Sequence, residues 1–397
     1  MRYLLILPLL FVCLCLTAQG DRSIAFAGGS WEEALQQAKA ADKPVFLFAY
    51  TKSCHFCRQM ERDVFTDSTV AAYYNDHFLS YRIDIEDGAE GEALSDQYGI
   101  NAFPTYVFLS AEGEMLHQSA SAKPAADFIQ DAKDAGDPDR AIFSLMRRYD
   151  GGDRSPDLLF NYATALIDYK RRDSPQETVV GEYLATQSPE QLTSDATLRL
   201  LFDTYLPFAS PATQHFLEHH EAYLPLFGRE EVDRKLRYTI RNAASTAGRD
   251  QDDEQLTTIK ATLAQHFPDE PSMTALTEIY YYQGAADWLA YARATLRYAS
   301  AAGKVDEAPL IETAKYLRHF AEEQQVFELG AQLMRQITDK EPTYENLLLL
   351  AEMQDGAEQP GEALQTAEEA LRVAADSGED DAAARELIVK LASDRKG

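Results

Sequence analysis

An unbroken apolar run over residues 45–50 leads directly into two cysteines that are separated by two residues, Cys54 and Cys57. The length and the apolar character of the run predict a buried, central strand. Met60 and Val64 follow at helical spacing, so the cysteines are expected at a strand-to-helix junction. The first sulfur would lie at a helix N-terminus, where backbone N–H groups and the helix dipole stabilise a thiolate. The second cysteine, one turn further along, is placed to close a disulfide.

The start of the chain predicts export. Residues 1–20 have the features of a secretory signal peptide, because Arg2 precedes an apolar run over residues 4–16 and small residues follow it. The run is short for a membrane span, and no later stretch is long and apolar enough for one, so the mature chain is expected to have no span. A lipid anchor on Cys13 or Cys15 is the alternative, but neither follows the small residue that lipoprotein processing favours. The predicted location is the periplasm or the extracellular space.

Removal of this signal would leave a single, local cysteine pair in the mature protein. Such a pair closes too small a loop to stabilise the fold much by chain entropy, and secreted proteins stabilised by disulfides place their cysteines in distant pairs. Two thiols fall short of a four-thiolate zinc site, and Arg58 follows Cys57 where attached haem would need a histidine. Redox chemistry is therefore favoured, with no cofactor and no metal. Capture of copper(I) or zinc by Cys54, His55 and Cys57 is a weaker alternative.

The composition limits the classes of partner. The 397-residue chain has a net charge of −28, whereas nucleic acids and anionic membranes attract proteins with basic patches. Neither is expected as a partner. The length is sufficient for about two or three domains.

The first part of the chain, residues 21–135, alternates between helical and strand-like patterns. Ser30 is expected to cap the first helix, and Pro124 to open the last one. The expected helices cover residues 31–38, 54–65, 68–74, 90–98 and 124–129, and the expected strands cover residues 45–50, 78–85, 105–109 and 115–118. Helices and strands in this order predict an α/β domain.

This order of elements, with the cysteine pair after the central strand, resembles the thioredoxin superfamily. The segment from Tyr98 to Thr105 is similar to the family's segment that ends in a cis-proline, and the run from Cys54 to Glu61 is similar to a subgroup of thioredoxin-like proteins, many of them exported. The resemblance implies that Cys54 is the attacking thiolate and that Cys57 is the resolving thiol. Attack on a substrate disulfide would give a mixed disulfide, which Cys57 would then release.

The Phe103–Pro104 segment is the expected substrate-binding element. A cis X–Pro bond costs only about 0.5–1 kcal/mol over trans and makes a tight bend. Such a bend would let the Phe103 backbone offer its N–H and C=O to an extended substrate segment beside the disulfide. The alternative is a plain turn that opens a strand.

Four residues around the cysteines bear on the redox properties. Lys52 could supply a favourable positive charge, although a solvated loop lysine is an equally good interpretation. His55 could favour the thiolate when it is protonated. Two residues depart from the family pattern: Ser53 stands where many thioredoxins have tryptophan, and Phe48 stands where a buried acid assists proton transfer to the resolving thiol. The absence of that acid leaves reductase, oxidase and isomerase roles open.

The remainder of the chain, residues 136–397, is predicted to be helical after a linker around residues 134–140. Small residues precede large ones by one helical turn at intervals of about 37 residues, which is in the range of helical-hairpin repeats. These pairs are Ala292 and Leu296, Gly330 and Met334, and Ala367 and Leu371. An α-solenoid-like array with similarity to tetratricopeptide repeats is expected, and such arrays bind partners on a concave face.

One continuous helix is expected over residues 213–224, where His215 and His219 could share a metal. A solvated helix face is the favoured interpretation of the two histidines, because a third ligand is missing.

Two functional hypotheses result. The first is an exported thiol–disulfide oxidoreductase that acts on protein thiols or disulfides and whose helical module holds a client or an unidentified redox partner. The second is a non-catalytic interaction scaffold in which the thioredoxin-like domain is an adaptor and the cysteines form a passive disulfide. The sequence does not give the direction of electron flow.

Overall fold

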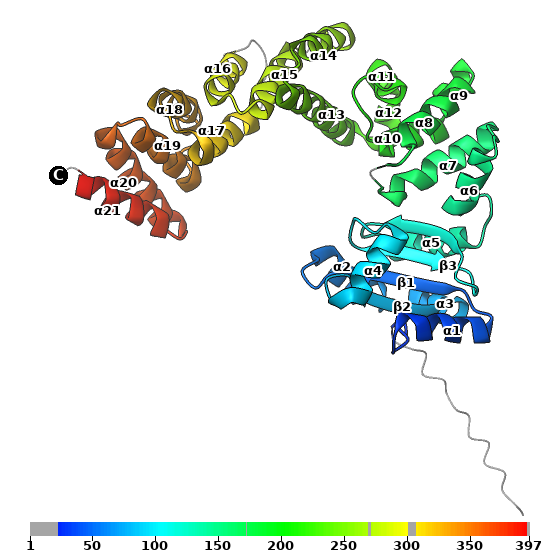
Figure 1. The fold of residues 1–397 in the computed structure, drawn as a ribbon. Helices are drawn as coiled ribbons and strands as arrows, with labels where there is room; N and C mark the ends of the chain where they lie inside the picture. Colours follow the sequence, from blue (N-terminus) through cyan, green and yellow to red (C-terminus); the bar gives the residue numbers. More distant parts are fainter. Residues whose placement is uncertain (1–22, 172, 269–270, 301–306, 395–397) are drawn as a thin grey trace, which may run out of the picture. The chain divides into compact units, whose positions relative to one another are not determined.

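The computed structural model describes residues 23–171, 173–268, 271–300 and 307–394. Contacts divide the chain into two units, Met1–Leu192 and Thr193–Gly397. The first unit contains a mixed sheet with its helices, and the second is helical (Figure 1). The expected signal peptide over residues 1–20 lies outside the described residues.

A four-stranded sheet organises the first unit. Its strands are β1 (Val45–Tyr50), β2 (Leu79–Asp84), β3 (Thr105–Leu109) and β4 (Met115–Ala120), in the spatial order β2-β1-β3-β4. β1 runs parallel to β2 and antiparallel to β3, and β4 is antiparallel to β3. All four predicted strands are thereby confirmed, and β1 is a central strand as expected.

The side chains of β1 enter two separate cores, one on each face of the sheet. Phe46 and Phe48 belong to a core with the helices around the cysteines, whereas Val45 and Leu47 belong to a core with the first helix. Successive residues of a strand point to opposite faces. Burial on both faces explains why this strand is apolar at every position.

Six helical segments surround the sheet, and polar side chains cap the starts of α1 and α3. They are α1 (Trp31–Ala41), α2 (His55–Gln59), the single π-helical segment η1 (Met60–Val64), α3 (Ser68–His77), α4 (Gly88–Tyr98) and α5 (Ala125–Ala135). The Ser30 hydroxyl accepts the N–H of Glu33, and the Glu33 carboxylate accepts the N–H of Ser30 in return, which confirms the predicted cap of α1. Asp67 caps α3 in a similar way, by accepting two N–H groups of its first turn.

Four more helices belong to the first unit, and the first two contact the sheet. They are α6 (Ile142–Asp150), α7 (Pro156–Tyr169), α8 (Gln176–Ala185) and α9 (Pro189–Leu192). Both α6 and α7 contact β4, and the N–H of Ile142 donates to Nδ1 of the buried His117 on that strand at 3.2 Å. The compact unit therefore extends beyond the linker that was expected around residues 134–140.

The second unit is all-helical, as predicted. Its helices are α10 (Asp195–Asp203), α11 (Pro211–Glu218), α12 (His220–Phe227), α13 (Arg229–Asp250), α14 (Asp253–His266), α15 (Pro271–Gly284), α16 (Trp288–Ala299), α17 (Ala308–Phe320), α18 (Gln324–Thr338), α19 (Tyr344–Gly356), α20 (Pro360–Ser377) and α21 (Ala382–Asp394). From α15 onward consecutive helices contact each other, and α16 also contacts α18. Within the described ranges, none of these helices is long and apolar enough to cross a membrane.

The small residues of the predicted repeat lie at helix contacts. Ala292 and Ala367 are fully buried. A Cβ atom on Gly330 would meet the sulfur of Met353 on the next helix, so the glycine lets the two helices approach without a shift of that side chain. These positions agree with the role expected of small residues between paired helices, whereas the type of repeat stays a prediction.

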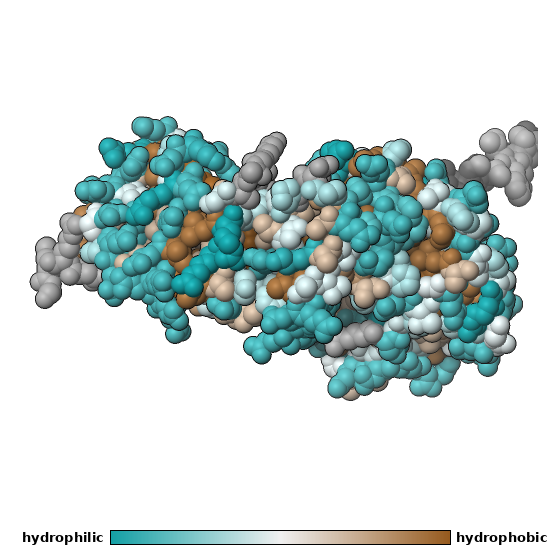
Figure 2. Space-filling model, turned by 90° about the horizontal axis from the view of Figure 1, so that it is seen from above, coloured by the Kyte–Doolittle hydropathy of each residue, from teal (hydrophilic) through white to brown (hydrophobic). Residues whose placement is uncertain are grey.

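On the face seen in Figure 2 most residues are hydrophilic and the hydrophobic ones form separate patches.

The expectation of one helix over residues 213–224 is wrong, and so is the solvated face proposed for His215. The chain breaks between α11 and α12 at His219, and His215 is buried with Nδ1 at 3.3 Å from the hydroxyl of Tyr223. The rings of the two histidines lie 4.5 Å apart. In the part of the chain that the structure describes, no group of three potential metal ligands includes them.

The burial of His215 predicts that acid destabilises the second unit. Burial, with a smaller effect from His219, lowers the pKa of His215 to about 4 in the folded protein. Because an unfolded histidine has a pKa of about 6.5, the unfolded chain binds a proton that the folded chain does not as the pH falls through this window. The free energy of unfolding is therefore expected to decrease by about 3 kcal/mol between pH 7 and pH 4 from this group.

Urea unfolding followed by circular dichroism at both pH values measures this effect. His215→Gln is expected to flatten the pH dependence, whereas His319→Gln, on an exposed position of α17, should leave it unchanged. An equal pH dependence in the His215→Gln protein and the unmodified protein would contradict the assignment.

Candidate redox site

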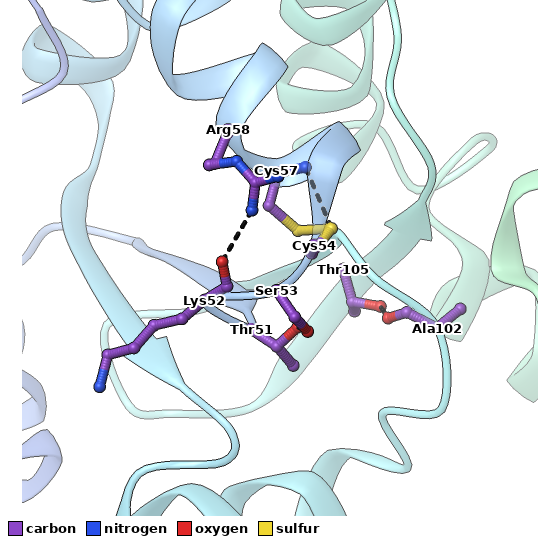
Figure 3. The surroundings of a disulfide bond; sticks show 8 residues. All are labelled: Thr51, Lys52, Ser53, Cys54, Cys57, Arg58, Ala102 and Thr105. Atoms are coloured by element: carbon purple, nitrogen blue, oxygen red, sulfur yellow. Dashed lines mark hydrogen bonds between the residues drawn. A yellow bond between two sulfur atoms is a disulfide. The ribbon is translucent and has the colours of Figure 1, made fainter. Parts of the chain in front are cut away.

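The two cysteines lie at the junction that the sequence predicted. β1 ends at Tyr50, and Cys54 is the N-cap residue of α2. Cys54 and Cys57 form a disulfide with their Cα atoms 5.3 Å apart, and the N–H of Cys57 donates to Sγ of Cys54 at 3.1 Å (Figure 3). Cys57 is 1% exposed, whereas Cys54 is half-buried. The first sulfur of the pair is therefore the one that a partner molecule can reach.

Hydrogen bonds hold the loop that carries Cys54. The N–H of Cys54 donates to the carbonyl oxygen of Thr51 at 3.1 Å. The guanidinium of Arg58, one turn into the helix, donates to the carbonyl oxygen of Lys52 at 2.7 Å (Figure 3). Sequence reasoning missed this function of Arg58, since nothing in the six-residue spacing identifies the contact. The bond ties the loop before Cys54 to the helix after it.

The proline segment lies at the same end of the two central strands as the cysteine pair. The Phe103–Pro104 peptide bond is cis, as the resemblance implied. Pairing of Ala49 with Thr105 places the start of β3 beside the end of β1, from which the cysteine loop departs. Thr105 donates its hydroxyl to the carbonyl oxygen of Ala102 at 2.7 Å, and both residues lie in the surroundings of the disulfide in Figure 3. A substrate function of Phe103 and Pro104 stays a prediction.

The two residues expected to tune the pair differ in their surroundings. The Lys52 ammonium lies 3.0 Å from a carboxylate oxygen of Asp87 and 3.2 Å from one of Asp84. These carboxylates raise the pKa of Lys52, and Figure 3 shows its side chain directed away from the sulfur atoms. His55 is exposed next to Phe56, with their rings edge to face at 5.7 Å. The positive charge of Lys52 is thus bound to acidic partners, while His55 stays accessible.

An exposed aromatic ring accompanies the accessible sulfur. Phe56, between the two cysteines, is 56% exposed, which makes it one of the few large apolar side chains so accessible among the described residues. An apolar side chain in water is a favourable contact for an apolar group of a partner. From the sequence this residue was only part of the intervening dipeptide, because its exposure depends on the helix packing.

Aromatic packing occupies the place of the missing acid. Phe48 is fully buried and contacts Tyr50, Phe65 and Tyr106 with ring-centroid distances of 5.3, 4.9 and 6.1 Å. Aromatic contacts therefore surround the position at which the usual family pattern has a buried acid.

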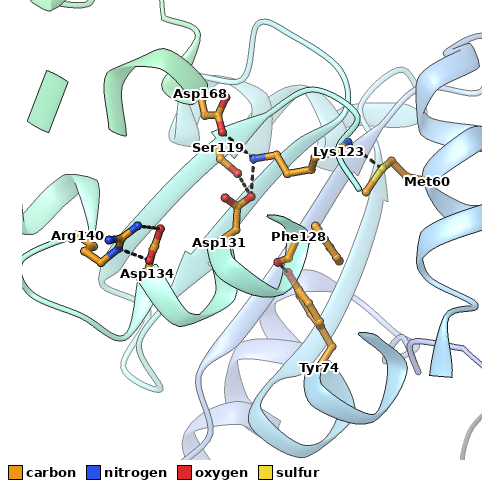
Figure 4. A network of polar contacts seen from close by, with 9 residues as sticks. All are labelled: Met60, Tyr74, Ser119, Lys123, Phe128, Asp131, Asp134, Arg140 and Asp168. Carbon is orange, nitrogen blue, oxygen red and sulfur yellow. Dashed lines mark hydrogen bonds and ion pairs between the residues drawn. The ribbon is translucent and has the colours of Figure 1, made fainter. Parts of the chain in front are cut away.

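A polar network around Lys123 also contacts this core, and no sequence motif indicated it. The Lys123 ammonium donates to Asp131 at 2.6 Å and to Asp168 of α7 at 3.0 Å, and the hydroxyl of Ser119 donates to Asp131 at 2.6 Å (Figure 4). The backbone N–H of Lys123 lies 3.4 Å from the sulfur of Met60, in the helix that follows the cysteines. Burial alone would lower the pKa of Lys123, but the two carboxylates raise it. Through these contacts the network connects η1, strand β4 and α7.

Comparisons with known proteins agree with this geometry. A model described as a thioredoxin-like domain matches residues 31–136. The chain is 32% identical over 111 residues to the disulfide bond reductase DsbH of Chlamydia pneumoniae, which covers 25% of this chain and 66% of that protein. It is 35% identical over 82 residues to the thiol:disulfide interchange protein DsbD of Ralstonia nicotianae, which covers 21% of this chain and 14% of that protein. The chain thus spans only part of the length of each of these relatives.

A solved structure, that of a candidate disulphide-isomerase from Bacteroides thetaiotaomicron, is 35% identical and has a TM-score of 0.28. The match covers 29% of this chain and 95% of that one. The family model lies within the first unit, and the relatives and the solved structure cover 21–29% of this chain. Residues 31–136, with the Cys54–Cys57 pair, therefore belong to the thioredoxin-like family, and an all-helical region follows them.

Proposed function

We propose that this protein is an exported thiol–disulfide oxidoreductase that acts through Cys54 and Cys57. The observation that carries the proposal is the difference in accessibility of the two sulfurs: Cys54 is half-buried at the helix start, and Cys57 is 1% exposed behind it. A reachable sulfur beside an enclosed one separates the attacking thiol from the resolving thiol. The similarity to proteins named as a disulfide bond reductase and a thiol:disulfide interchange protein supports the same chemistry.

Each sulfur has its own role in the proposed exchange. In the reduced protein, the Cys54 thiolate attacks one sulfur of a client disulfide, and the other client sulfur leaves as a thiolate. Cys57 then attacks Sγ of Cys54, forms the intramolecular disulfide and releases the second client thiol. The client gains two electrons and the cysteine pair loses two. The same steps in reverse would oxidise a client dithiol.

The cis-proline segment would orient the client. The carbonyl and N–H groups at Phe103 precede β3, whose first residue pairs with β1 beside the cysteine loop. An extended client segment could add there as a strand, with main-chain hydrogen bonds that tolerate many sequences. Phe56 would contact an apolar group of the same client. The all-helical region is proposed as the module that holds a client or a redox partner.

Reduction of insulin disulfides by the full chain, with dithiothreitol as the electron source, tests the proposal. The unmodified protein is expected to accelerate reduction, and Cys54→Ser is expected to lower the rate to that of dithiothreitol alone, because the attacking sulfur is gone. Ser68→Ala is the control, since Ser68 is an exposed residue in the first turn of α3 and is not part of the cysteine loop. An unchanged rate in the Cys54→Ser protein would end the proposal.

The direction of electron flow follows from the potential of the pair. A value near about −270 mV would make the protein a reductant, and one near about −120 mV would make it an oxidant. Equilibration of the full chain with glutathione buffers, with the redox state measured by alkylation and mass spectrometry, gives this value.

A second candidate function is an interaction scaffold with a passive disulfide. The fully buried Phe48 favours it, because the side chain that would assist proton transfer is replaced by an aromatic contact. A scaffold would capture the same partners when both cysteines are replaced by serine. Loss of every partner from that double variant would exclude the scaffold and leave the oxidoreductase.

A further inference from the structure

A cavity of about 330 Å³ lies within the second unit, and the residues that line it come from α10, α11, α13, α14 and the loop over residues 204–210. Figure 1 labels these helices. Leu201, Phe208 and Phe216 contribute apolar surface to its wall, and Lys235 and Asn242 contribute polar groups. The volume is at the lower end of the range of about 300–1,000 Å³ that small-molecule sites occupy. The cysteine pair belongs to the other unit, so a ligand site in this cavity is independent of the redox proposal.

Lys235 carries the only ammonium group among the residues that line this cavity in the described chain. The residue is 5% exposed, and its Nζ donates to the carbonyl oxygens of Phe202 and Thr204 at 2.6 and 2.8 Å. Nζ also lies 4.2 Å from the ring centroid of Tyr205 and 5.4 Å from that of Phe216. Because an ammonium has three donors, the two carbonyl groups leave one for another acceptor.

The charge of this ammonium is not neutralised by its hydrogen-bond partners in the described structure, since both are uncharged carbonyl groups. Burial lowers the pKa of Lys235 to about 8, and the Asp203 carboxylate opposes that change only in part. A buried cation gains most from an anionic partner, because its own hydration has been lost. An anion in the cavity would supply that partner.

A purely structural role explains only part of this arrangement. Lys235 bonds the last carbonyl groups of α10, and a cation at a helix C-terminus is favourable by itself. That role does not require an open cavity beside the ammonium. It also does not account for two aromatic rings left in water at the cavity wall.

Those rings belong to Tyr205 and Tyr238, which are 59% and 49% exposed. They meet edge to face with their centroids 4.9 Å apart, and both line the cavity. Large aromatic side chains with one accessible face are favourable contacts for an apolar ligand body. The wall therefore offers aromatic surface next to a positive charge.

We propose that this cavity binds a small carboxylate with an apolar or aromatic body, the carboxylate pairing with Lys235 and the body resting on Tyr205, Tyr238 and Phe216. The ligand chemistry is a carboxylate next to an apolar group. It could come from a free acid or from the C-terminal residue of a polypeptide, and the two sources can be distinguished by experiment.

Isothermal titration of the full chain with 3-phenylpropionate and with 3-phenylpropanamide tests the proposal. The acid is expected to bind at least about tenfold more tightly than the amide, which has the same body without the charge. Lys235→Met should remove this preference, whereas Lys340→Met, which changes an exposed lysine of the same unit, should retain it. Equal affinities of acid and amide for the unmodified protein, or no binding of either, would overturn the proposal.

A measurement on the unmodified protein covers the case in which Lys235→Met fails to fold. Reductive methylation at Lys235, followed by peptide mass spectrometry, should be slowed by 3-phenylpropionate and not by the amide. A hexapeptide that ends in phenylalanine with a free carboxylate distinguishes the sources: tighter binding than the free acid indicates a polypeptide end, and binding of the free acid alone indicates a small metabolite. Methylation at the same rate with and without the acid would count against the site.

Discussion

Cys57→Ser is expected to accumulate covalent complexes with client proteins, whereas Cys54→Ser is not. The half-buried Cys54 remains able to attack a client disulfide in the first variant. The mixed disulfide then persists, because the enclosed thiol that would release the client has been removed. The backbone N–H of residue 57 still points at Sγ of residue 54, so the attacking thiolate keeps its hydrogen bond.

Non-reducing gels and mass spectrometry of the captured proteins measure the difference. Both full-chain variants are reduced, freed of reductant and mixed with the same disulfide-containing proteins. We expect at least about tenfold more adduct with Cys57→Ser than with Cys54→Ser, since a thiol attacks in proportion to its accessible thiolate. The double serine variant is the background. Equal adduct yields from the two single variants would contradict the assignment of attacking and resolving sulfurs.

The parts of the site that could be predicted are those that local sequence determines. A strand buried on both faces has to be apolar throughout, so residues 45–50 identify β1 without any knowledge of its partners. The cap at Ser30 needs only Glu33 three residues later. The position of Cys54 at a helix start follows from the end of that strand and the beginning of helical spacing. The same local signals also located β3, whereas the Phe103–Pro104 bend was expected from the resemblance to the thioredoxin superfamily.

The parts that could not be predicted depend on side chains that meet across the fold. Lys123 binds Asp168 because α7 contacts β4, and no pattern in a single sequence pairs residues 45 positions apart. The break at His219 was missed because residues 213–224 keep helical spacing through it. The π-helical segment η1 after Gln59 likewise has no sequence signature. Such features arise from packing, which overrides local propensity.

For Phe48, the sequence predicted part of the site and left another part to the structure. The sequence shows that residue 48 is not an acid, and this is enough to set the chain apart from the usual family pattern. It does not show what the ring contacts. The structure supplies the neighbours, Tyr50, Phe65 and Tyr106, and places the hydroxyl of Tyr106 without a hydrogen-bond partner among the described residues. The chemical consequence of the change, an apolar environment, follows only from these contacts.

Lys123→Met is expected to destabilise the first unit by about 3–5 kcal/mol, because it leaves a buried carboxylate without its cation. The side chains of Lys123 and Asp131 are 7% and 11% exposed. In the variant, Asp131 keeps the hydroxyl of Ser119 as a donor but loses the ammonium at 2.6 Å. A neutral donor does not replace a charge-assisted bond in a site that water barely reaches.

The two tryptophans allow this loss to be measured in the first unit alone. Trp31 is buried in the core of the first unit and Trp288 begins α16 of the second. In a Trp288→Phe background, urea unfolding followed by fluorescence therefore reports the unit that contains Lys123. Lys133→Met, at an exposed position of α5, should change the free energy of unfolding by less than about 0.5 kcal/mol.

A double variant separates the cost of the unpaired charge from the value of the ion pair itself. Lys123→Met with Asp131→Leu removes both charges, and apolar side chains of similar size often replace a buried ion pair with little loss of stability. We expect this protein to regain most of the stability lost in Lys123→Met, because the uncompensated carboxylate is gone. If Lys123→Met were no less stable than Lys133→Met, the network would contribute nothing to the attachment of α7, and the first unit would be held together by its aromatic core alone.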